Sequence, residues 1–267
     1  MDANLNEWLH LLVRWFHVFA GILWIGQTYF FSWLDARLNE VTEGNPSGQA
    51  WMVHSGGFYL VGRQKVPQAL PQKLHWFKWE AAFTWLSGMV LLILVYNMGG
   101  LMVDEGVSSI SVGGAIGVGL GLLPVSWVVY DLLWSSPLQR APRIGAAISF
   151  LLIVATGFIL SQLLSGRAAY IHVGAMLGTL MTANVWLRIL PAQKQLVAAI
   201  QEGKAPDGAL AARAKGRSKH NTYMVVPVVL IMISNHFPTA TYGNDHNWAI
   251  LGLIVLLGWG AAKLLRG

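Results

Sequence analysis

The chain has 267 residues, of which 55% are hydrophobic and only 11% are charged. An ordinary soluble domain carries roughly 25% charged residues, so the composition excludes a soluble globule and favours a protein embedded in a bilayer. The sequence contains no cysteine, which excludes disulfides, thiolate metal sites and covalently attached haem. Any metal centre must therefore use histidine, methionine or carboxylate ligands.

Seven segments of the sequence are long and apolar enough to cross a bilayer, which requires about 20 residues in a helix. They lie at roughly 8–34, 76–97, 110–134, 143–165, 168–190, 220–237 and 247–264. The first begins with acids, contains Arg14 and has no small-residue cleavage site, so it predicts a retained helix rather than a signal peptide. The expected fold class is an all-α integral membrane bundle of about seven transmembrane helices, with residues 1–267 as one domain.

Charged residues alternate between the connections and set an expected orientation. The basic connections are 35–75 with Arg37, Arg63, Lys65 and Lys73, 135–143, 191–219 and the C-terminus with Lys263 and Arg266. The opposite side carries Asp2, Glu7, Asp104, Glu105 and Asp245, with Arg167 as its one loop cation. This pattern predicts an outer N-terminus and a cytoplasmic C-terminus in a bacterial inner membrane. Because topology explains the net charge of +6, no nucleic acid partner is expected.

Two of the predicted cytoplasmic connections are long. Within the first, at about 36–75, the run WMVHSGGFYLVG (51–62) places a Ser-Gly-Gly turn between short apolar runs, which predicts a β-hairpin. This hairpin is either a lid under the bundle or an interfacial element without chemistry. The second, at about 191–219, is predicted to be a short amphipathic or flexible basic loop. The glycine-rich third span allows close helix approach or leaves room for a flat cofactor.

Ionisable side chains inside a membrane span are costly and indicate function. His10, Arg14 and His17 are spaced i, i+4, i+7 and therefore share one face of the first span. A b-type haem in a bundle takes imidazoles from facing helices and needs a cation near its propionates. These rules predict His17 and His172 as axial ligands and Arg14 as the propionate partner. His10 and His236 match His172 better in depth and remain alternatives, and histidines that only hydrogen-bond within the bundle are the competing interpretation.

A second polar group lies near the cytoplasmic side, where the run HWFKWE places His75, Lys78 and Glu80 at the start of the second span. A buried glutamate can transfer protons, and a lysine can bind an anion. The competing interpretation is an interfacial set that reaches water. The sixth span carries further polar residues and is kinked by a proline; they are Asn221, Tyr223, Ser234, Asn235 and His236. They indicate either a polar ligand or a packed polar network.

Several runs resemble the membrane domain of the cytochrome-c-linked bacterial urate oxidase (urate hydroxylase) family. The runs are RWFHVFAGILWIGQTYFF (14–31), WMVHSGGFYLV (51–61), LHWFKWEAAFTWLSG (74–88), VVYDLLWSSPL (128–138) and HNTYMVVPVVLIMISNHFP (220–238). The resemblance covers nearly the whole chain in order. Typical members add an eighth helix and a C-terminal cytochrome c domain. This sequence has neither, so the resemblance implies a separate cytochrome c as acceptor, a fragment, or a diverged reaction.

The resemblance implies oxidation of urate to 5-hydroxyisourate, with water as the oxygen source and electrons passing through haem b to cytochrome c. One or more haems are expected, and a bis-histidine haem would relay electrons. The expected catalytic residues are Glu80 and His75. The expected urate-binding residues are Lys78, Asn221, Tyr223, Asn235 and His236. They lie at opposite ends of one span, so an outer site near His236 and an inner site near His75 both remain open.

Three other functions remain open at this point. A b-type cytochrome would carry electrons from quinol to cytochrome c and would ignore urate. A haem-dependent protoporphyrinogen oxidase would share a histidine in its first helix. A non-redox transporter or assembly protein would purify without colour, although no inverted repeat is evident in the sequence.

Overall fold

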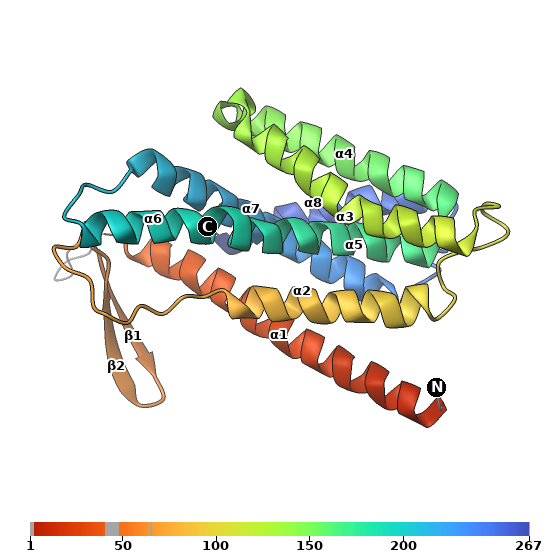
Figure 1. Cartoon of the computed structure of the whole chain (residues 1–267), viewed down its shortest axis with the longest axis horizontal. Helices are drawn as coiled ribbons and strands as arrows, with labels where there is room; N and C mark the ends of the chain where they lie inside the picture. Colours follow the sequence, from red (N-terminus) through yellow and green to blue (C-terminus); the bar gives the residue numbers. More distant parts are fainter. Residues whose placement is uncertain (1–2, 41–47, 65, 267) are drawn as a thin grey trace.

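The protein is a bundle of long helices with a small β-hairpin at one end, as seen in a computed structural model that describes residues 3–40, 48–64 and 66–266 (Figure 1). The helices are α1 (Ala3–Arg37), α2 (Trp79–Leu91), α3 (Val112–Ser135), α4 (Pro142–Leu163), α5 (Gly166–Ala183), α6 (Leu190–Gln201), α7 (Gly208–Ser234) and α8 (Asn247–Arg266). A π-helical segment, η1 (Leu92–Asn97), continues α2. A second, η3 (Asn184–Ile189), joins α5 to α6, and the short η2 (Pro137–Arg140) precedes α4.

Six helices in the described part of the chain are long and apolar enough to cross a membrane. They are Asn4–Arg37, Trp79–Asn97, Val112–Ser135, Pro142–Leu163, Gly166–Gln201 and Asn247–Arg266. The chain is therefore a multi-pass membrane protein with a mainly helical fold. The predicted sixth span, 220–237, falls on α7, which is not among the six because its N-terminal half is polar and basic. The total of seven spans and their orientation remain predictions.

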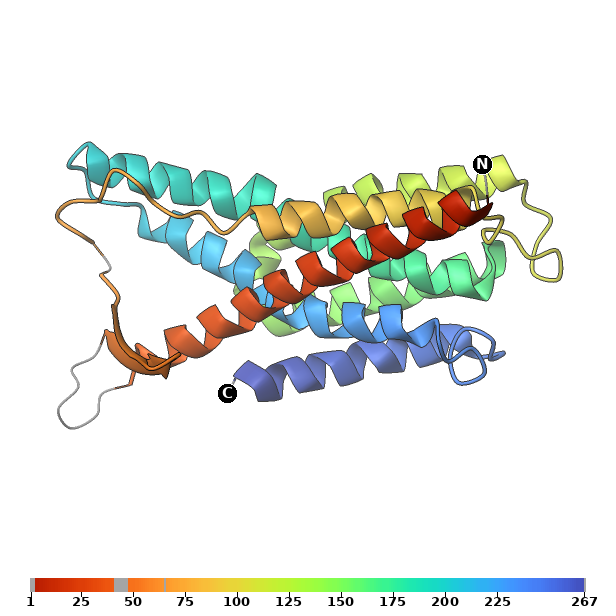
Figure 2. The same cartoon turned by 90° about the horizontal axis from the view of Figure 1, so that it is seen from below.

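The second long connection differs from its prediction as a basic loop. Residues 191–219 are helical except for the turn between α6 and α7. Gly203, at a φ of 70°, ends α6. Asp207 then caps α7, because its carboxylate accepts hydrogen bonds from the backbone N–H groups of Ala209 and Leu210. Both helices thus continue beyond the apolar part of the bundle, as Figure 2 also shows.

The predicted hairpin is confirmed. Strands β1 (Gln49–His54) and β2 (Gly57–Gly62) pair antiparallel, and Trp51 faces Leu60 across the ladder. Ser55 and Gly56 form the turn, both at positive φ, which is the backbone geometry that matches the twist of paired strands. The hairpin extends sideways from the end of α1 rather than beneath the bundle (Figure 1), so it does not form a lid under the helices.

Helix α5 is the centre of the bundle, and α1 lies at its edge. Half of the apolar window of α5 and its continuation is buried inside the protein, against 6% of the window in α1. Tyr170 and Leu177 of α5 are 1% exposed and pack with side chains from the surrounding helices. Helix α1 packs mainly along α2. Helices α1, α2, α5 and α7 enclose a cavity between the edge and the centre of the bundle.

The connections gather at the two ends as the charge pattern predicts. The N-terminus and the loops after η1, α4 and α7 lie at one end of the bundle (Figures 1 and 2). The hairpin, η2 and the α6–α7 turn lie toward the other, basic end. Asp2 and Lys65, which contributed to the predicted orientation, lie outside the described residues.

Candidate functional site

A cavity of about 270 Å³ lies among α1, α2, η1, α5 and α7. Most of its lining is apolar, and the indole rings of Trp24 and Trp85 form part of the wall. Trp85 is oriented by a 3.0 Å hydrogen bond from its Nε1–H to Thr179 Oγ1. Two of the lining positions are glycines with room beside them, because a Cβ at Gly178 would meet nothing within 4 Å and one at Gly21 would only touch a methyl group at 3.9 Å. An apolar cavity with flat walls suits a flat ligand.

The end of the cavity nearer the N-terminus is polar and positively charged. Arg14, Arg167, Tyr96, Asn235 and His236 line it. Asn235 Oδ1 accepts hydrogen bonds from Arg167 Nε at 3.1 Å and from the Tyr96 hydroxyl at 3.2 Å, which fixes the amide in place. Neither arginine forms an ion pair with any residue that the structure describes. Two guanidinium groups without carboxylate partners make this end a site for an anion.

His17 presents a free ring nitrogen beside this polar end. Its Nδ1–H donates to the backbone oxygen of Thr84 at 2.9 Å and lies 3.0 Å from Ser87 Oγ. Since a carbonyl oxygen can only accept, the proton is on Nδ1, and Nε2 keeps its lone pair. A backbone carbonyl that fixes the tautomer in this way is typical of a histidine that binds a metal. The ring fits closely against α2 because residue 88 is glycine, where a Cβ would lie 3.0 Å from His17 Cε1.

His172 has the same kind of support but faces another way. Its Nδ1–H donates to the backbone oxygen of Ala168 at 2.8 Å, and the side chain is 1% exposed. Its Nε2 packs on α3, where a Cβ at Gly119 would lie only 2.5 Å from it. His172 is not among the residues lining the cavity, whereas His17 and His236 both are. The structure therefore does not bring His17 and His172 together across the cavity. His236, which the sequence offered as an alternative partner for His172, lines the cavity with His17 instead.

The predicted residues at the start of α2 lie outside the cavity. Lys78 Nζ lies 5.1 Å from the ring of Trp79 and 5.7 Å from that of Trp186. The His75 ring packs on Phe77 at 4.5 Å. Glu80 Oε2 is buried and has no hydrogen-bond partner among the described residues. These side chains form a separate group toward the basic end.

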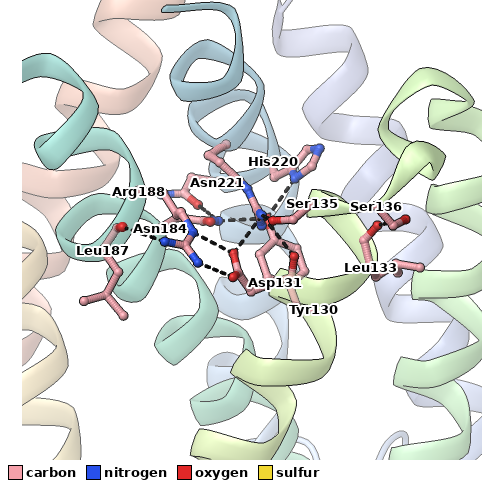
Figure 3. Close-up of polar contacts among 11 residues, drawn as sticks. Tyr130, Asp131, Leu133, Ser135, Ser136, Asn184, Leu187, Arg188, His220 and Asn221 are labelled. Carbon is pink, nitrogen blue, oxygen red and sulfur yellow. Dashed lines mark hydrogen bonds and ion pairs between the residues drawn. The ribbon is translucent and has the colours of Figure 1, made fainter. Parts of the chain in front are cut away.

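Three other predicted residues also lie elsewhere. The ring of Tyr223 lies under the guanidinium of Arg266 at 5.9 Å. His10 is not part of the cavity lining, and its Nε2 is buried without a partner in the described part of the chain. Asn221 belongs to a polar network between α3, η3 and α7 (Figure 3). None of the three lines the cavity.

Most polar groups of the network in Figure 3 pair with one another, although Asn184 Oδ1 and Arg217 Nη1 are buried without a partner in the described part of the chain. Asn184 Nδ2 donates to Asn221 Oδ1 and to the Tyr130 hydroxyl, each at 2.9 Å, and Tyr130 Oη lies 2.7 Å from His220 Nδ1. Beside it, the carboxylate of Asp131 accepts from Arg188 and from Arg217, whose Nη2 lies 2.8 Å from Oδ1. Such mutual pairing indicates a structural role, which was one of the two interpretations of Asn221.

A family model described as "Urate oxidase N-terminal" matches residues 3–265. The chain belongs to the urate oxidase N-terminal family. The match covers α1 to α8, so the cavity lies within the region that defines the family. Comparisons with curated proteins and with solved structures gave no match.

Some residues lining the cavity of this urate oxidase family member are of the types that hold a b-type haem. Haem supplies its own in-plane ligands and takes only axial ligands from the protein, and His17 offers Nε2. Its propionates need a cation at the polar end, where Arg14 lies without an ion-pair partner among the described residues. The residues that the structure describes include no group of three or more His, Asp or Glu residues suited to a metal ion alone. The donor set thus fits a haem and does not resemble a site for a bare metal.

The sequence predicted four residues of this cavity and missed others. Arg14, His17, Asn235 and His236 line it as candidate site residues. Arg167 appeared only as a loop cation. Tyr96 and Gly178 were not predicted, because no motif or ionisable residue beside them in the sequence indicates a binding site. A search for a second cation at the depth of Arg14 would have found Arg167.

Proposed function

We propose that this chain oxidises urate in the cavity between α1, α2, α5 and α7. The observation that carries the proposal is the polar end of the cavity, where Arg14 and Arg167 lie without carboxylate partners in a member of the urate oxidase family. Urate is a flat monoanion at neutral pH. A charged end suits its negative charge, and the tryptophan walls suit its flat rings.

The reaction converts the urate monoanion and water to neutral 5-hydroxyisourate and releases two electrons and one proton. A haem b held by this chain would supply one-electron transfer to a separate cytochrome c. His17 would hold the iron through Nε2, and Arg14 would pair with a propionate. His236, which also lines the cavity, is the favoured second ligand. We place the protein in a bacterial inner membrane, with the polar end of the cavity toward the outer face.

The remaining polar residues bind and orient the substrate. Arg167 uses Nε to hold Asn235, so its terminal amino groups stay available for the carbonyl oxygens of urate. The Tyr96 hydroxyl donates to the same Asn235 oxygen and thereby fixes the clamp that Arg167 and Asn235 form. Catalytic roles for Glu80 and His75, and urate contacts for Lys78, Asn221 and Tyr223, remain predictions of the sequence. The cavity geometry does not favour them, because none of these residues lines it.

A larger side chain in the wall of the cavity tests this proposal. Gly178 lines the cavity and Gly260 is exposed on α8, yet a Cβ at either position would meet nothing within 4 Å. We expect Gly178→Leu to reduce urate oxidation, measured with cytochrome c as acceptor, by about tenfold or more, which corresponds to about 1.4 kcal/mol of lost interaction. The matched variant Gly260→Leu should keep its activity. Equal activity in both variants would show that the reaction takes place elsewhere.

A further inference from the structure

The β-hairpin presents an apolar face that no described part of the protein covers. Its other face packs on the end of α1, where Ala50 is 4% exposed and contacts Leu34 and Leu38. The uncovered face is formed by alternate residues of the two strands. Its side chains are Trp51, Val53, Phe58 and Leu60, and they are between 49% and 78% exposed.

The hairpin sequence is unusual for a strand pair in water. Residues 49–62 contain no lysine, arginine, aspartate or glutamate. Exposed edge strands in soluble proteins normally carry charges that prevent pairing with other chains. Tryptophan, tyrosine and phenylalanine without charges are instead typical of segments at the boundary between membrane and water. The composition therefore points to lipid around the hairpin.

The position of the hairpin along α1 agrees with this environment. Phe31 and Trp33 of α1 are 42% and 45% exposed, and Phe31 contacts the exposed Phe77 before α2 at 4.8 Å. Trp33 and the charged residues Asp35 and Arg37 that follow it indicate the membrane boundary at this end. Leu34, which contacts the hairpin, lies three residues after Phe31, or about 4.5 Å along the helix axis. The headgroup region on each side of a bilayer is roughly 5–8 Å thick, so the base of the hairpin lies at headgroup depth.

The direction of the hairpin keeps it at this depth. Figure 1 shows both strands running sideways from the end of α1, away from the other helices and across the long axis of the bundle. A segment that leaves the bundle sideways at headgroup depth lies over lipid.

Positively charged side chains lie toward the same end of the bundle as the hairpin. Lys73 follows the hairpin in sequence, and Arg213 and Lys219 lie in the N-terminal half of α7. These three side chains form no ion pair within the part of the chain that the structure describes. Phospholipids with anionic headgroups supply the complementary charge.

We propose that the hairpin is a membrane-interface anchor: it lies in the headgroup layer with its Trp51–Phe58 face in contact with lipid, beside a basic surface that binds anionic headgroups. The anchor holds the end of α1, one wall of the cavity, at a fixed depth. The inference concerns a surface far from the cavity and does not depend on the proposed urate reaction.

The absence of cysteine allows a direct test with single nitroxide labels. The label is placed by Phe58→Cys, and by Val53→Cys as a second variant on the same face. Two positions serve as references: Leu132→Cys on α3, which is 66% exposed on an apolar helix, and Lys204→Cys in the α6–α7 turn. Each protein is reconstituted into phosphatidylcholine bilayers with and without phosphatidylglycerol. Collision rates with oxygen and with a water-soluble nickel chelate are then measured.

We expect labels at 58 and 53 to collide with oxygen and to lose most nickel collisions, as at Leu132, and the loss to deepen with phosphatidylglycerol. Nickel access equal to that at Lys204 in both bilayers would overturn the proposal and would leave the face to a soluble protein partner. Folding of each variant is checked by its helical circular dichroism. Because either label alone reports the depth, failure of one variant to fold leaves the other to decide.

Discussion

His17 and His172 show that similar hydrogen bonds do not give two residues similar roles. Each donates Nδ1–H to a backbone carbonyl, but only His17 lines the cavity. We therefore predict that His17→Ala removes the absorption band of a b-type haem from the purified protein. His172→Ala should retain the band, because its Nε2 faces Gly119 on α3.

The measurement is the haem content of both variants purified in parallel, determined from the absorption spectrum per mole of protein. His17→Gln is a useful addition, since it keeps much of the side-chain volume and removes the imidazole. A haem band that survives in His17→Ala but disappears in His172→Ala would reverse the assignment.

For individual residues, the sequence predicted several side chains of the cavity. It did not predict which side chains contact one another. Spacing placed Arg14 and His17 on one face of a helix. It could not place Arg167 and Tyr96 at Asn235, because those contacts join residues that are 68 and 139 positions apart. It also paired His17 with His172 as imidazoles on facing helices, although their depths did not match. The rotation of α5 about its axis, which turns His172 toward α3, depends on packing with several helices and leaves no local signal.

Between elements, the Asp131 carboxylate ties α3 to η3 and α7. Its side chain is 13% exposed, and that of its partner Arg217 is 7% exposed. Asp131→Ala would leave Arg217 buried without a countercharge, a loss that costs about 3–5 kcal/mol for a buried pair. We predict a marked decrease in the midpoint of thermal unfolding in detergent. The matched control is Glu202→Ala, which breaks an exposed pair with Lys204 and should change stability by less than about 0.5 kcal/mol. Equal midpoints in the two variants would refute a structural role for the network.

The contact between α7 and α8 depends on a glycine of α8 that packs on Pro227 of α7. A Cβ at Gly258 would lie 2.6 Å from both the N and Cδ atoms of Pro227, which are parts of a rigid ring and backbone. Gly258→Ala should therefore separate the helices and destabilise the protein by about 1–3 kcal/mol. Gly260→Ala, two residues away with open space around it, should be neutral or slightly stabilising because alanine favours helix. Thermal unfolding of the pair measures the difference, and a Gly258→Ala protein as stable as Gly260→Ala would contradict the close packing.

The sequence predicted the membrane helices and the hairpin well but missed how far two helices extend. Hydropathy measures how apolar a segment is, so it identified each apolar window. It carries no information on whether α6 and α7 remain helical beyond the apolar region. The cap at Asp207 was readable in principle, since aspartate before a helix is a known start signal. The π-helical segments η1 and η3 were not predictable, because the extra residue in each turn reflects contacts with neighbouring helices.

In the whole molecule, the end that carries the N-terminus and the basic end differ in chemistry. The cavity opens with its cationic residues toward the end that carries the N-terminus, while the buried network and the hairpin lie toward the basic end. A substrate anion and an outer cytochrome c would thus meet the protein on one face. The opposite end fixes the helices to one another and, through the hairpin, to the bilayer.

The central claim is that urate gives electrons to a haem held by this chain. Its most direct test is an absorption spectrum of the detergent-purified, haem-replete protein, recorded oxidised, then with urate under exclusion of oxygen, then with dithionite. We predict that urate alone produces the reduced bands of a b-type haem and that dithionite adds little more. A haem that dithionite reduces and urate does not would contradict urate oxidation and support a b-type cytochrome that carries electrons from quinol, while a colourless protein would contradict the haem itself.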